Sequence, residues 1–371
     1  MTGGKILIVG GGIGGLTAAT ALAQRGFAVT VVERGGAASV EGVGISQQAN
    51  VVRAMAGLGL AREYLEAGFA YDAVEIYAPS GERIARIPSR SLIDGYPASM
   101  GIPRPALQHL LTRAAQEAGA HVRYDTTVQA IEDDGTVVHV AFSDGGSDTF
   151  DVLLAADGIY SQVRRTIFPE APAPRFVGQA VWRYNLPRPD GFDALQVYNG
   201  PTGVGFVPMS QDATYIYATT PEVSGERLAR EGLARRMRER LSGCATAVQA
   251  AAEQITDDGG VVYRPLEALF LPEAWHRGRV ALLGDAVHAT TPHLGQGGGM
   301  AIEDAVVIAD ELARHATPEE AFSAYRERRF ERCRYVVEKS LEICRGQLGL
   351  GPLVDNAKAG AEMNALLAQP I

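Results

Sequence analysis

Cysteine is scarce in this sequence. Its 371 residues include only Cys244, Cys333 and Cys344, and no two of them form a Cys-x-x-Cys pair. A disulfide framework or a structural zinc site needs paired or closely spaced cysteines, so neither is expected and no metal site is predicted. Such sparse cysteine usage is typical of a protein of the reducing cytoplasm.

Basic charge and long apolar runs are lacking too. There are 34 lysines and arginines against 43 acidic residues, a net charge of -9, which argues against a nucleic-acid partner. No window reaches the roughly 20 apolar residues of a membrane span. Residues 5–23 imitate a signal peptide, but their cluster of glycines is unfavourable in an apolar helix.

Glycine, by contrast, is abundant, and its first cluster follows the apolar run "KILIVG" (5–10). Gly10, Gly12 and Gly15 form a Gly-x-Gly-x-x-Gly motif between two predicted strands, and the second strand ends in Glu33. These glycines permit a tight turn, a close approach of backbone to a pyrophosphate, and close packing of helix on strand. Glu33 can bind a ribose hydroxyl and would repel a 2′-phosphate, which favours FAD or NAD over NADP here.

A second glycine cluster lies in "GDAVHATTPHLGQGGGMAIEDA" (284–305). A buried strand over 279–285 should end in Gly284-Asp285, and a glycine-rich loop should precede a helix starting near Met300. An acid at a strand tip can bind a polyol hydroxyl, while N–H groups at a helix N-terminus suit an electron-rich edge. A flavin offers both, as a ribityl chain and an isoalloxazine ring. The two glycine clusters can therefore hold the two ends of one FAD.

The segments between these motifs show their own periodicity. Two amphipathic helices are predicted first, several strands follow, and then come alternating stretches typical of antiparallel strands with one pocket-facing side. The long arginine-rich helix near the end is interpreted as carrying its charges on a solvated face. The elements are predicted at 50–68 and 101–119 (helices), 121–158 and 170–220 (strands), 225–254 (helix), 261–270 (strand) and 318–345 (helix).

Together these motifs resemble the group A flavoprotein monooxygenases, the single-component aromatic hydroxylases related to para-hydroxybenzoate, salicylate and hydroxynicotinate hydroxylases. "GGGIGG" with Glu33, "DVLLAADGIYSQVRR" with Asp157 and Gly158, and the 284–305 stretch match three family motifs in order and spacing. "EGVGISQQAN" (41–50) and "IPRPAL" are similar as well. The resemblance covers about residues 5–345.

The resemblance implies a fold and a set of cofactor contacts. The fold is α/β, with a Rossmann-like FAD-binding domain of the GR2 type interleaved with a mainly antiparallel β substrate domain, plus a C-terminal helix. The FAD-binding parts are 1–72, 101–170 and 271–345, the substrate parts are 73–100 and 171–270, and 346–371 is a tail without an assigned task. The implied cofactor residues are Gly10, Gly12, Ile13, Gly14, Gly15, Glu33, Arg34, Gly44, Ile45, Arg104, Val128, Asp157, Gly158, Arg164, Gly284, Asp285, Pro292, Gly295, Gln296, Gly297, Gly298, Gly299 and Met300.

The resemblance also implies a reaction. NADH or NADPH reduces FAD without a second Rossmann unit to hold the nicotinamide. O₂ then gives a flavin C4a-hydroperoxide that hydroxylates an aromatic substrate, a phenolic or heteroaromatic acid. This chemistry needs a pocket that excludes water. A monomer or a homodimer is expected.

Candidate substrate and catalytic residues lie on the predicted substrate sheet and on the flavin loop, the glycine-rich stretch 284–299 that is expected to hold the flavin ring. They are Arg183, Tyr198, Tyr215, Tyr217, His288, Pro292 and His293. Arg183 could pair with a substrate carboxylate or phenolate, or form a surface or interdomain salt bridge. Tyr215 and Tyr217 share one face at period two, so both point into the pocket or both point away from it, and ordinary packing within the sheet is the alternative to a role in the site. His288 could instead brace the loop by hydrogen bonding, and Trp182 is expected in the core.

Other functions stay open at this point. One is an oxygenase that modifies or inactivates a larger polycyclic or quinone-like substrate. Others are a non-catalytic nucleotide-binding sensor and an NAD-dependent dehydrogenase, which would be colourless. A flavin halogenase is disfavoured because no Gly-Trp-x-Trp-x-Ile-Pro stretch occurs.

Overall fold

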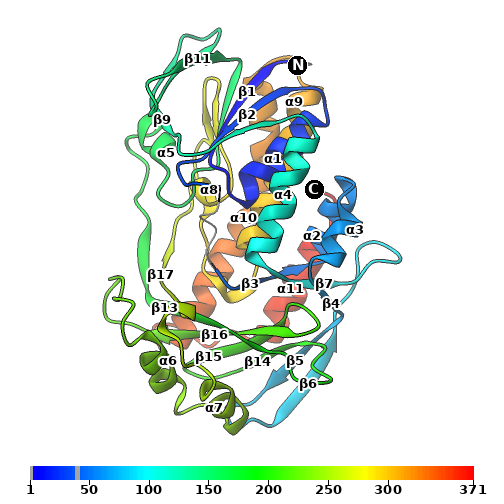
Figure 1. Cartoon of the computed structure of the whole chain (residues 1–371), viewed down its shortest axis with the longest axis vertical. Coiled ribbons are helices and arrows are strands. Elements are labelled where there is room, and N and C mark those ends of the chain that lie inside the picture. The colour runs from blue at the N-terminus through cyan, green and yellow to red at the C-terminus, as the bar shows by residue number, and fades with distance from the viewer. Residues whose placement is uncertain (1–2, 38–41) are drawn as a thin grey trace.

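A parallel sheet forms the upper layer of the computed structural model, which describes residues 3–37 and 42–371 (Figure 1). Its strand order is β18-β19-β12-β1-β2-β8, and only β18 runs antiparallel to its neighbour. The central strands are buried on both faces, which explains their continuous apolar sequences. The strands are β1 (Lys5–Val9), β2 (Ala28–Val32), β8 (His121–Arg123), β12 (Val152–Ala155), β18 (His276–Arg277) and β19 (Val280–Leu282).

Helices from distant parts of the chain cover this sheet. α1 (Ile13–Ala23) packs between α4 (Arg104–Glu117) and α9 (Gly297–Arg314), and the long α10 (Pro318–Gln347) lies against α9. A small antiparallel sheet caps the same end (Figure 1). It is formed by β9 (Val128–Asp133), β10 (Val138–Phe142) and β11 (Ser147–Phe150).

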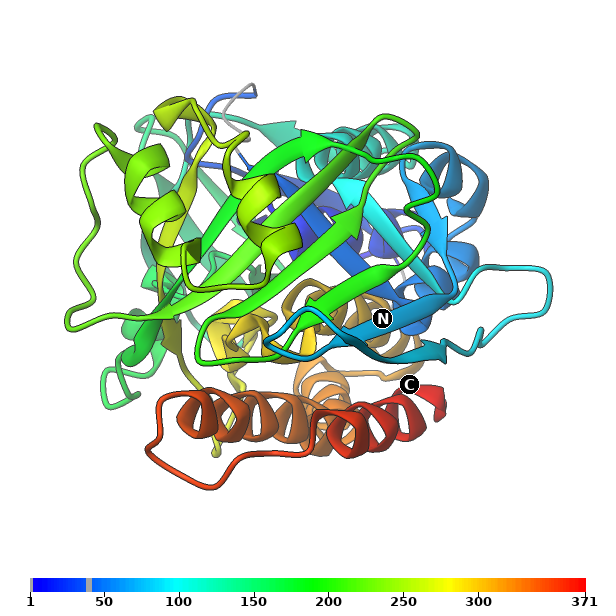
Figure 2. The same cartoon turned by 90° about the horizontal axis from the view of Figure 1, so that it is seen from below.

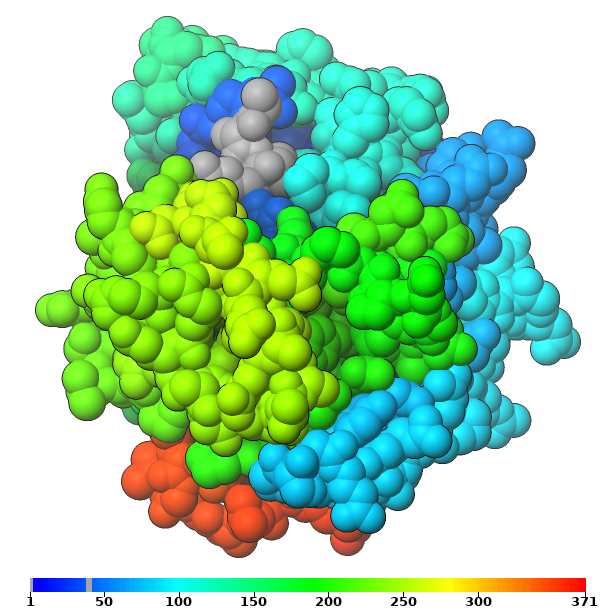
Figure 3. Space-filling view, turned by 60° about the horizontal axis from the view of Figure 1, so that its bottom comes forward, coloured from blue at the N-terminus to red at the C-terminus, as the bar shows by residue number. Residues whose placement is uncertain are grey.

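A second, seven-stranded sheet forms the other end of the molecule (Figure 1). In the space-filling view the green and yellow-green surface of this part of the chain fills the centre of the face (Figure 3). Its order is β17-β13-β16-β15-β14-β5-β6, and every pair is antiparallel except β14 with β5. α6 and α7 cover its outer face over a separate apolar core that includes Trp182. The elements are β5 (Ala73–Tyr77), β6 (Arg83–Pro88), β13 (Arg175–Pro187), β14 (Leu195–Tyr198), β15 (Gly203–Pro208), β16 (Ala213–Pro221), β17 (Val262–Ala268), α6 (Leu233–Leu241) and α7 (Thr246–Ala252).

The remaining elements connect the two layers. β3 (Gly44–Gln48), β7 (Ser99–Pro103) and β4 (Phe69–Tyr71) form a small sheet between them. The others are α2 (Ala49–Gly57), α3 (Ala61–Glu66), α5 (Gln162–Ile167), α8 (Asp285–His288), α11 (Asn356–Ala368) and two short 3-10 turns, η1 (Asp258–Gly260) and η2 (Pro292–Leu294).

The expected fold class is confirmed: a Rossmann-like layer is interleaved with a mainly antiparallel sheet. Three details differ from the sequence interpretation. The helix predicted at 50–68 is broken into α2 and α3, the one at 225–254 is reduced to α6 and α7, and α9 begins at Gly297 rather than near Met300. The segment boundaries proposed above stay predictions. Among the described residues, no helix is both long and apolar enough to cross a bilayer.

Candidate active site

A cavity of about 450 Å³ lies between the two layers. The inner face of the seven-stranded sheet forms one wall, and β3, the loop around η2 and the first turn of α9 form another. The end of α10 and one side of α11 complete it. The glycine-rich loop and the predicted substrate sheet, which are separate in the sequence, therefore face the same space.

The first glycine cluster forms a tight turn between β1 and α1. Gly10 has φ +110°, and a Cβ there would lie 2.4 Å from the carbonyl oxygen of Ala156. A Cβ on Gly15 would lie 2.0 Å from the carbonyl oxygen of Gly10, so helix and turn touch through backbone alone. At Gly12 a Cβ would meet nothing within 4 Å, which leaves free space at the α1 N-terminus, where an anion is favoured.

The acid at the end of β2 is held by this turn. One carboxylate oxygen of Glu33 accepts from the backbone N–H of Gly11 and the other from that of Gly35, each at 2.8 Å. A carboxylate has about four lone-pair sites, so Glu33 keeps capacity for two further donors. That capacity fits a ribose diol.

The second glycine cluster is the first turn of α9. Gly297 and Gly298 line the cavity, and the N-cap residue Gln296 makes no side-chain hydrogen bond to the free N–H groups of this turn. Gln296 instead forms a reciprocal amide pair with Asn50, at 3.1 and 3.2 Å. The helix therefore presents unpaired N–H groups to the cavity, as an electron-rich ring edge requires.

Asp285 lies between these two glycine clusters. The residue keeps exposed surface, while desolvation by the surrounding protein raises the pKa of its carboxyl. Arg104, at the start of α4, is near enough to act electrostatically on both Asp285 and Arg183. The turn at the α1 N-terminus, the acid Asp285 and the first turn of α9 thus offer groups that fit the pyrophosphate, the ribityl chain and the ring of an extended FAD.

Comparison with known proteins leads to the same conclusion. A family model described as "FAD binding domain" matches residues 4–340. The chain belongs to this family of flavoprotein monooxygenases. It is 34% identical to a putative FAD-dependent monooxygenase, YetM, of Bacillus subtilis over 92% of this chain and 94% of that protein. It is 31% identical to the 6-hydroxynicotinate 3-monooxygenase of Pseudomonas fluorescens, with 88% of each chain covered.

A solved structure agrees with the fold of this monooxygenase. The crystal structure of Klebsiella pneumoniae HpxO complexed with FAD and uric acid gives a TM-score of 0.84 at 28% identity, covering 99% of this chain and 93% of that one. The recognition of the family and of FAD as its cofactor is confirmed.

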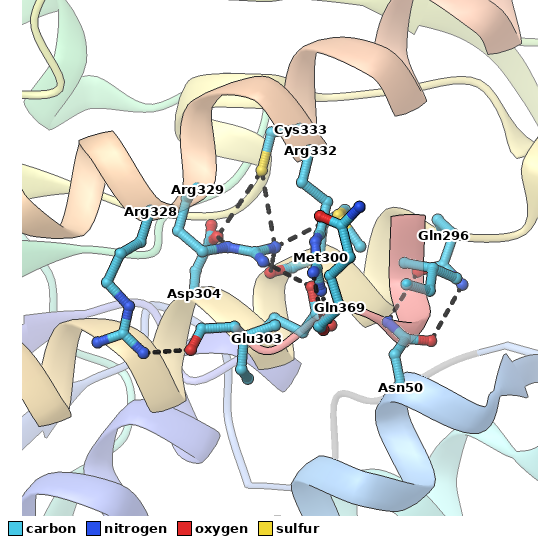
Figure 4. A network of polar contacts seen from close by, with 12 residues as sticks. Asn50, Gln296, Met300, Glu303, Asp304, Arg328, Arg329, Arg332, Cys333 and Gln369 are labelled. Carbon is cyan, nitrogen blue, oxygen red and sulfur yellow. Dashed lines mark hydrogen bonds and ion pairs between the residues drawn. The ribbon is translucent and has the colours of Figure 1, made fainter. Parts of the chain in front are cut away.

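Beneath the flavin loop the monooxygenase has a buried network of charges (Figure 4). Asp304 accepts from the backbone N–H of Gly284 at 2.9 Å and from His288 at 2.6 Å, so it fixes the Gly284-Asp285 turn. Arg329, fully buried on α10, donates to Asp304 at 2.8 Å and to Glu303 at 2.6 Å. Cys333 lies beside them as a free thiol. Both oxygens of Asp304 are therefore occupied.

This network corrects the interpretation of the arginine-rich helix. Its charges were expected on a solvated face, but Arg329 is fully buried and Arg332 is only 5% exposed. Arg332 donates to Glu303 at 2.9 Å. The prediction was wrong for these two because adjacent acids on α9 face inward and need buried cations.

The candidate substrate residues divide into two groups. Arg183, Tyr215 and Tyr217 line the cavity side by side, and both tyrosines face inward from β16. Burial raises the pKa of both phenols, so they remain protonated donors at neutral pH. Tyr198 also lines the cavity but stacks on Tyr77, with ring centroids 4.5 Å apart.

The two histidines have different surroundings. His288 is buried away from the cavity lining; burial disfavours its charged form, but nearby negative charge and the bond to Asp304 raise its pKa. His293 lines the cavity beside Pro292, and burial lowers its pKa to about 4. Its Nδ1 lies 2.8 Å from the Thr291 hydroxyl and its Nε2 lies 3.1 Å from Oε1 of Gln347. Because that amide oxygen only accepts, Nε2 carries the proton.

The remaining predicted cofactor residues lie at several depths. Gly44, Ile45, Pro292 and Gly295 line the cavity, and Asp157 accepts from the N–H groups of Gln162 and Val163. The Arg164 guanidinium is buried and donates to the carbonyls of Ala286 and Ile159, which ties α5 to α8. Contacts with the cofactor stay predictions for all of the residues named for it, including Gly14, Val128, Gly158, Gly299 and Met300, and Ile13 and Arg34.

Two parts of the site were missed. Gln347 and α11 line the cavity, yet the sequence analysis assigned the tail no task. Asp304 lies in the 284–305 stretch, and only its spacing after the glycine-rich loop could have indicated a role. The tail carries no such local signal.

The low pKa of His293 has a consequence for stability. The folded state resists protonating this imidazole between pH 6.5 and about 4, whereas the unfolded chain takes up the proton. The contribution of neutral His293 to the free energy of unfolding is complete above pH 6.5 and decreases as the pH falls toward 4. We expect His293→Gln to lose less stability than the parent between pH 7 and pH 5, by up to roughly 2 kcal/mol.

Urea unfolding of both proteins at the two pH values measures this difference. His139, an exposed histidine on β10, provides the control variant His139→Gln. Equal losses in the parent and in His293→Gln would contradict the assignment of a neutral His293.

Proposed function

We propose that this monooxygenase uses NADH or NADPH and O₂ to hydroxylate an anionic phenolic or heteroaromatic ring in the cavity, in the cytoplasm, with Arg183 holding the anion. The observation that carries this is the state of Arg183. Its side chain is half-buried and lines the cavity, and desolvation by the surrounding protein lowers its pKa. No hydrogen bond or ion pair from it is found within residues 3–37 and 42–371.

An unpaired cation that has lost part of its hydration is costly unless a ligand supplies the negative charge. Arginine stays protonated in proteins, so Arg183 cannot avoid this cost by losing its proton. Among the described lining residues there is no aspartate or glutamate, and Arg264 adds a second positive charge at the margin. A carboxylate or an oxyanion on the substrate fits this balance.

The other lining groups suit a planar ring with oxygen substituents. Tyr215 and Tyr217 are protonated donors beside Arg183, so their hydroxyls can donate to a ring oxygen. Val181, Val207 and Leu266 provide apolar surface that excludes water. Bound FAD would supply the activation of O₂, and the residues of the cavity would position the substrate.

The relatives' names are consistent with this substrate class. One relative at 31% identity is a 6-hydroxynicotinate 3-monooxygenase, and one at 30% identity over 362 residues is an FAD-dependent urate hydroxylase of Klebsiella pneumoniae. Both named substrates are oxygenated heteroaromatic rings. A larger substrate is the second candidate, because apolar lining continues to Met363 on α11 and a relative at 32% identity is the aurachin C monooxygenase/isomerase of Stigmatella aurantiaca.

The test is a screen for substrate-stimulated NAD(P)H oxidation with 6-hydroxynicotinate, urate and salicylate, with product mass showing one added oxygen atom. In Arg183→Gln we expect the KM of the active acid to rise about 10- to 100-fold, with unchanged FAD content.

Arg235→Gln, on the outer helix α6, is the matched control and should keep the parent KM. Arg183→Gln with an unchanged KM would refute the role of Arg183. Peroxide formation without hydroxylated product from every acid would count against the function itself.

A further inference from the structure

The C-terminal helix α11 forms a wall of the cavity. Asn356, Gly360 and Met363 line it and lie on one face of the helix, at spacings of four and three residues. The helix follows a loop that folds back after α10. Both helices run along one side of the molecule, beside the seven-stranded sheet (Figure 2). Any group that extends from the substrate ring toward this side must meet α11.

The far end of α11 is firmly attached. Arg53 on α2 donates to the carbonyl oxygens of Leu367 at 3.1 Å and of Ala368 at 3.4 Å. Arg332 donates to those of Gln369 at 3.0 Å and Pro370 at 3.2 Å. Both arginines also pair with the buried Glu303, so the helix is fixed to the network of Figure 4. The wall therefore has a defined position.

Gly360 is the unusual residue on this wall. Glycine is unfavourable inside a helix relative to alanine. Gly360 lines the cavity, its backbone is helical, and a Cβ there would meet nothing within 4 Å. The missing side chain leaves free space on the cavity side, so what this glycine provides is room in the cavity.

We propose that Gly360 sets the size limit for the substrate substituent that points toward α11. This inference rests on the proposed function and adds a residue that determines specificity. A larger side chain at this position projects into the cavity without backbone strain. It shortens the space for that substituent and leaves the ring, Arg183 and the flavin loop unchanged.

The test compares Gly360→Phe with Ala361→Phe in the FAD-loaded enzyme. Ala361 is the next residue of α11, is exposed and lies outside the cavity lining, so it is a matched control. The probes are salicylate and salicylates with linear alkyl chains of increasing length on the ring. Binding is measured by the change in flavin absorbance, and thermal unfolding checks the fold.

In Gly360→Phe we expect the affinity for the long-chain acids to fall at least about tenfold, while that for salicylate changes less than about threefold. Ala361→Phe should match the parent with every probe. Gly360→Ala, which favours the helix, should show a smaller loss in the same direction and serves if the phenylalanine variant does not fold.

Other outcomes overturn the inference. Equal losses for short and long acids, or equal behaviour of Gly360→Phe and Ala361→Phe, contradict a size limit at Gly360. If no salicylate binds the parent, the proposal of an anionic substrate fails. The binding of uncharged 2-alkyl-4-quinolones of increasing chain length to Gly360→Phe and Ala361→Phe then tests the size limit by itself. A parent protein that binds neither series contradicts both proposals.

Discussion

Replacing Arg329 by methionine is expected to lower the free energy of unfolding by about 3–5 kcal/mol. The guanidinium is fully buried and pairs with both Glu303 and Asp304, so its removal leaves buried carboxylates with too little positive charge. Asp304 also holds the Gly284 backbone and His288, so weaker FAD binding should accompany the loss. Urea unfolding with FAD titration measures both effects.

Arg334→Met is the control for this change. Arg334 lies on the same helix in an exposed pair with Glu331, which should contribute less than about 1 kcal/mol. If Arg329→Met were as stable as Arg334→Met, the buried network would not stabilise the fold as described.

The second large effect is expected at the nucleotide turn. Gly15→Ala should yield a chain without bound FAD, because its Cβ would lie 2.0 Å from the carbonyl oxygen of Gly10. Backbone cannot yield as a flexible side chain can, so α1 must move away from the turn that is predicted to hold the pyrophosphate. The ratio of flavin to protein absorbance after purification, with circular dichroism for the fold, measures the outcome.

Gly57→Ala is the matched glycine control. Gly57 ends α2 with a helical backbone, and a Cβ there would meet nothing within 4 Å. That variant should keep its FAD. A yellow, fully loaded Gly15→Ala protein would show that close backbone contact at this turn is not needed for binding.

The geometry of the first glycine turn was predictable because its signals are local. Gly10, Gly12, Gly15 and Glu33 act within one strand–turn–helix–strand unit, so their spacing in the chain fixes their spacing in space. Asp285 at a strand end followed the same logic. Alternation likewise placed Tyr215 and Tyr217 on one face, and the structure shows that this face is the inner one.

The rest depended on contacts between distant segments. Periodicity shows that α10 has a charged side, but not that α9 brings Glu303 and Asp304 against it. Nothing local distinguishes Gln347 from a surface glutamine, although it accepts from His293 across the cavity. The position of α11 at the cavity also depends on tertiary contacts. The apolar face of a short helix does not indicate which part of the protein it will cover.

The interleaved strand orders constrain how this protein is made. β1 pairs with β12, which in turn pairs with β19, and β5 pairs with β14. The later strand of each sheet is synthesised long after the earlier one, so neither large sheet can form completely while only the first half of the chain has left the ribosome. Pairings over such separations form slowly and leave strand edges open to aggregation in the meantime. Expression at reduced temperature and with abundant chaperones should therefore raise the soluble yield more than any change at the surface.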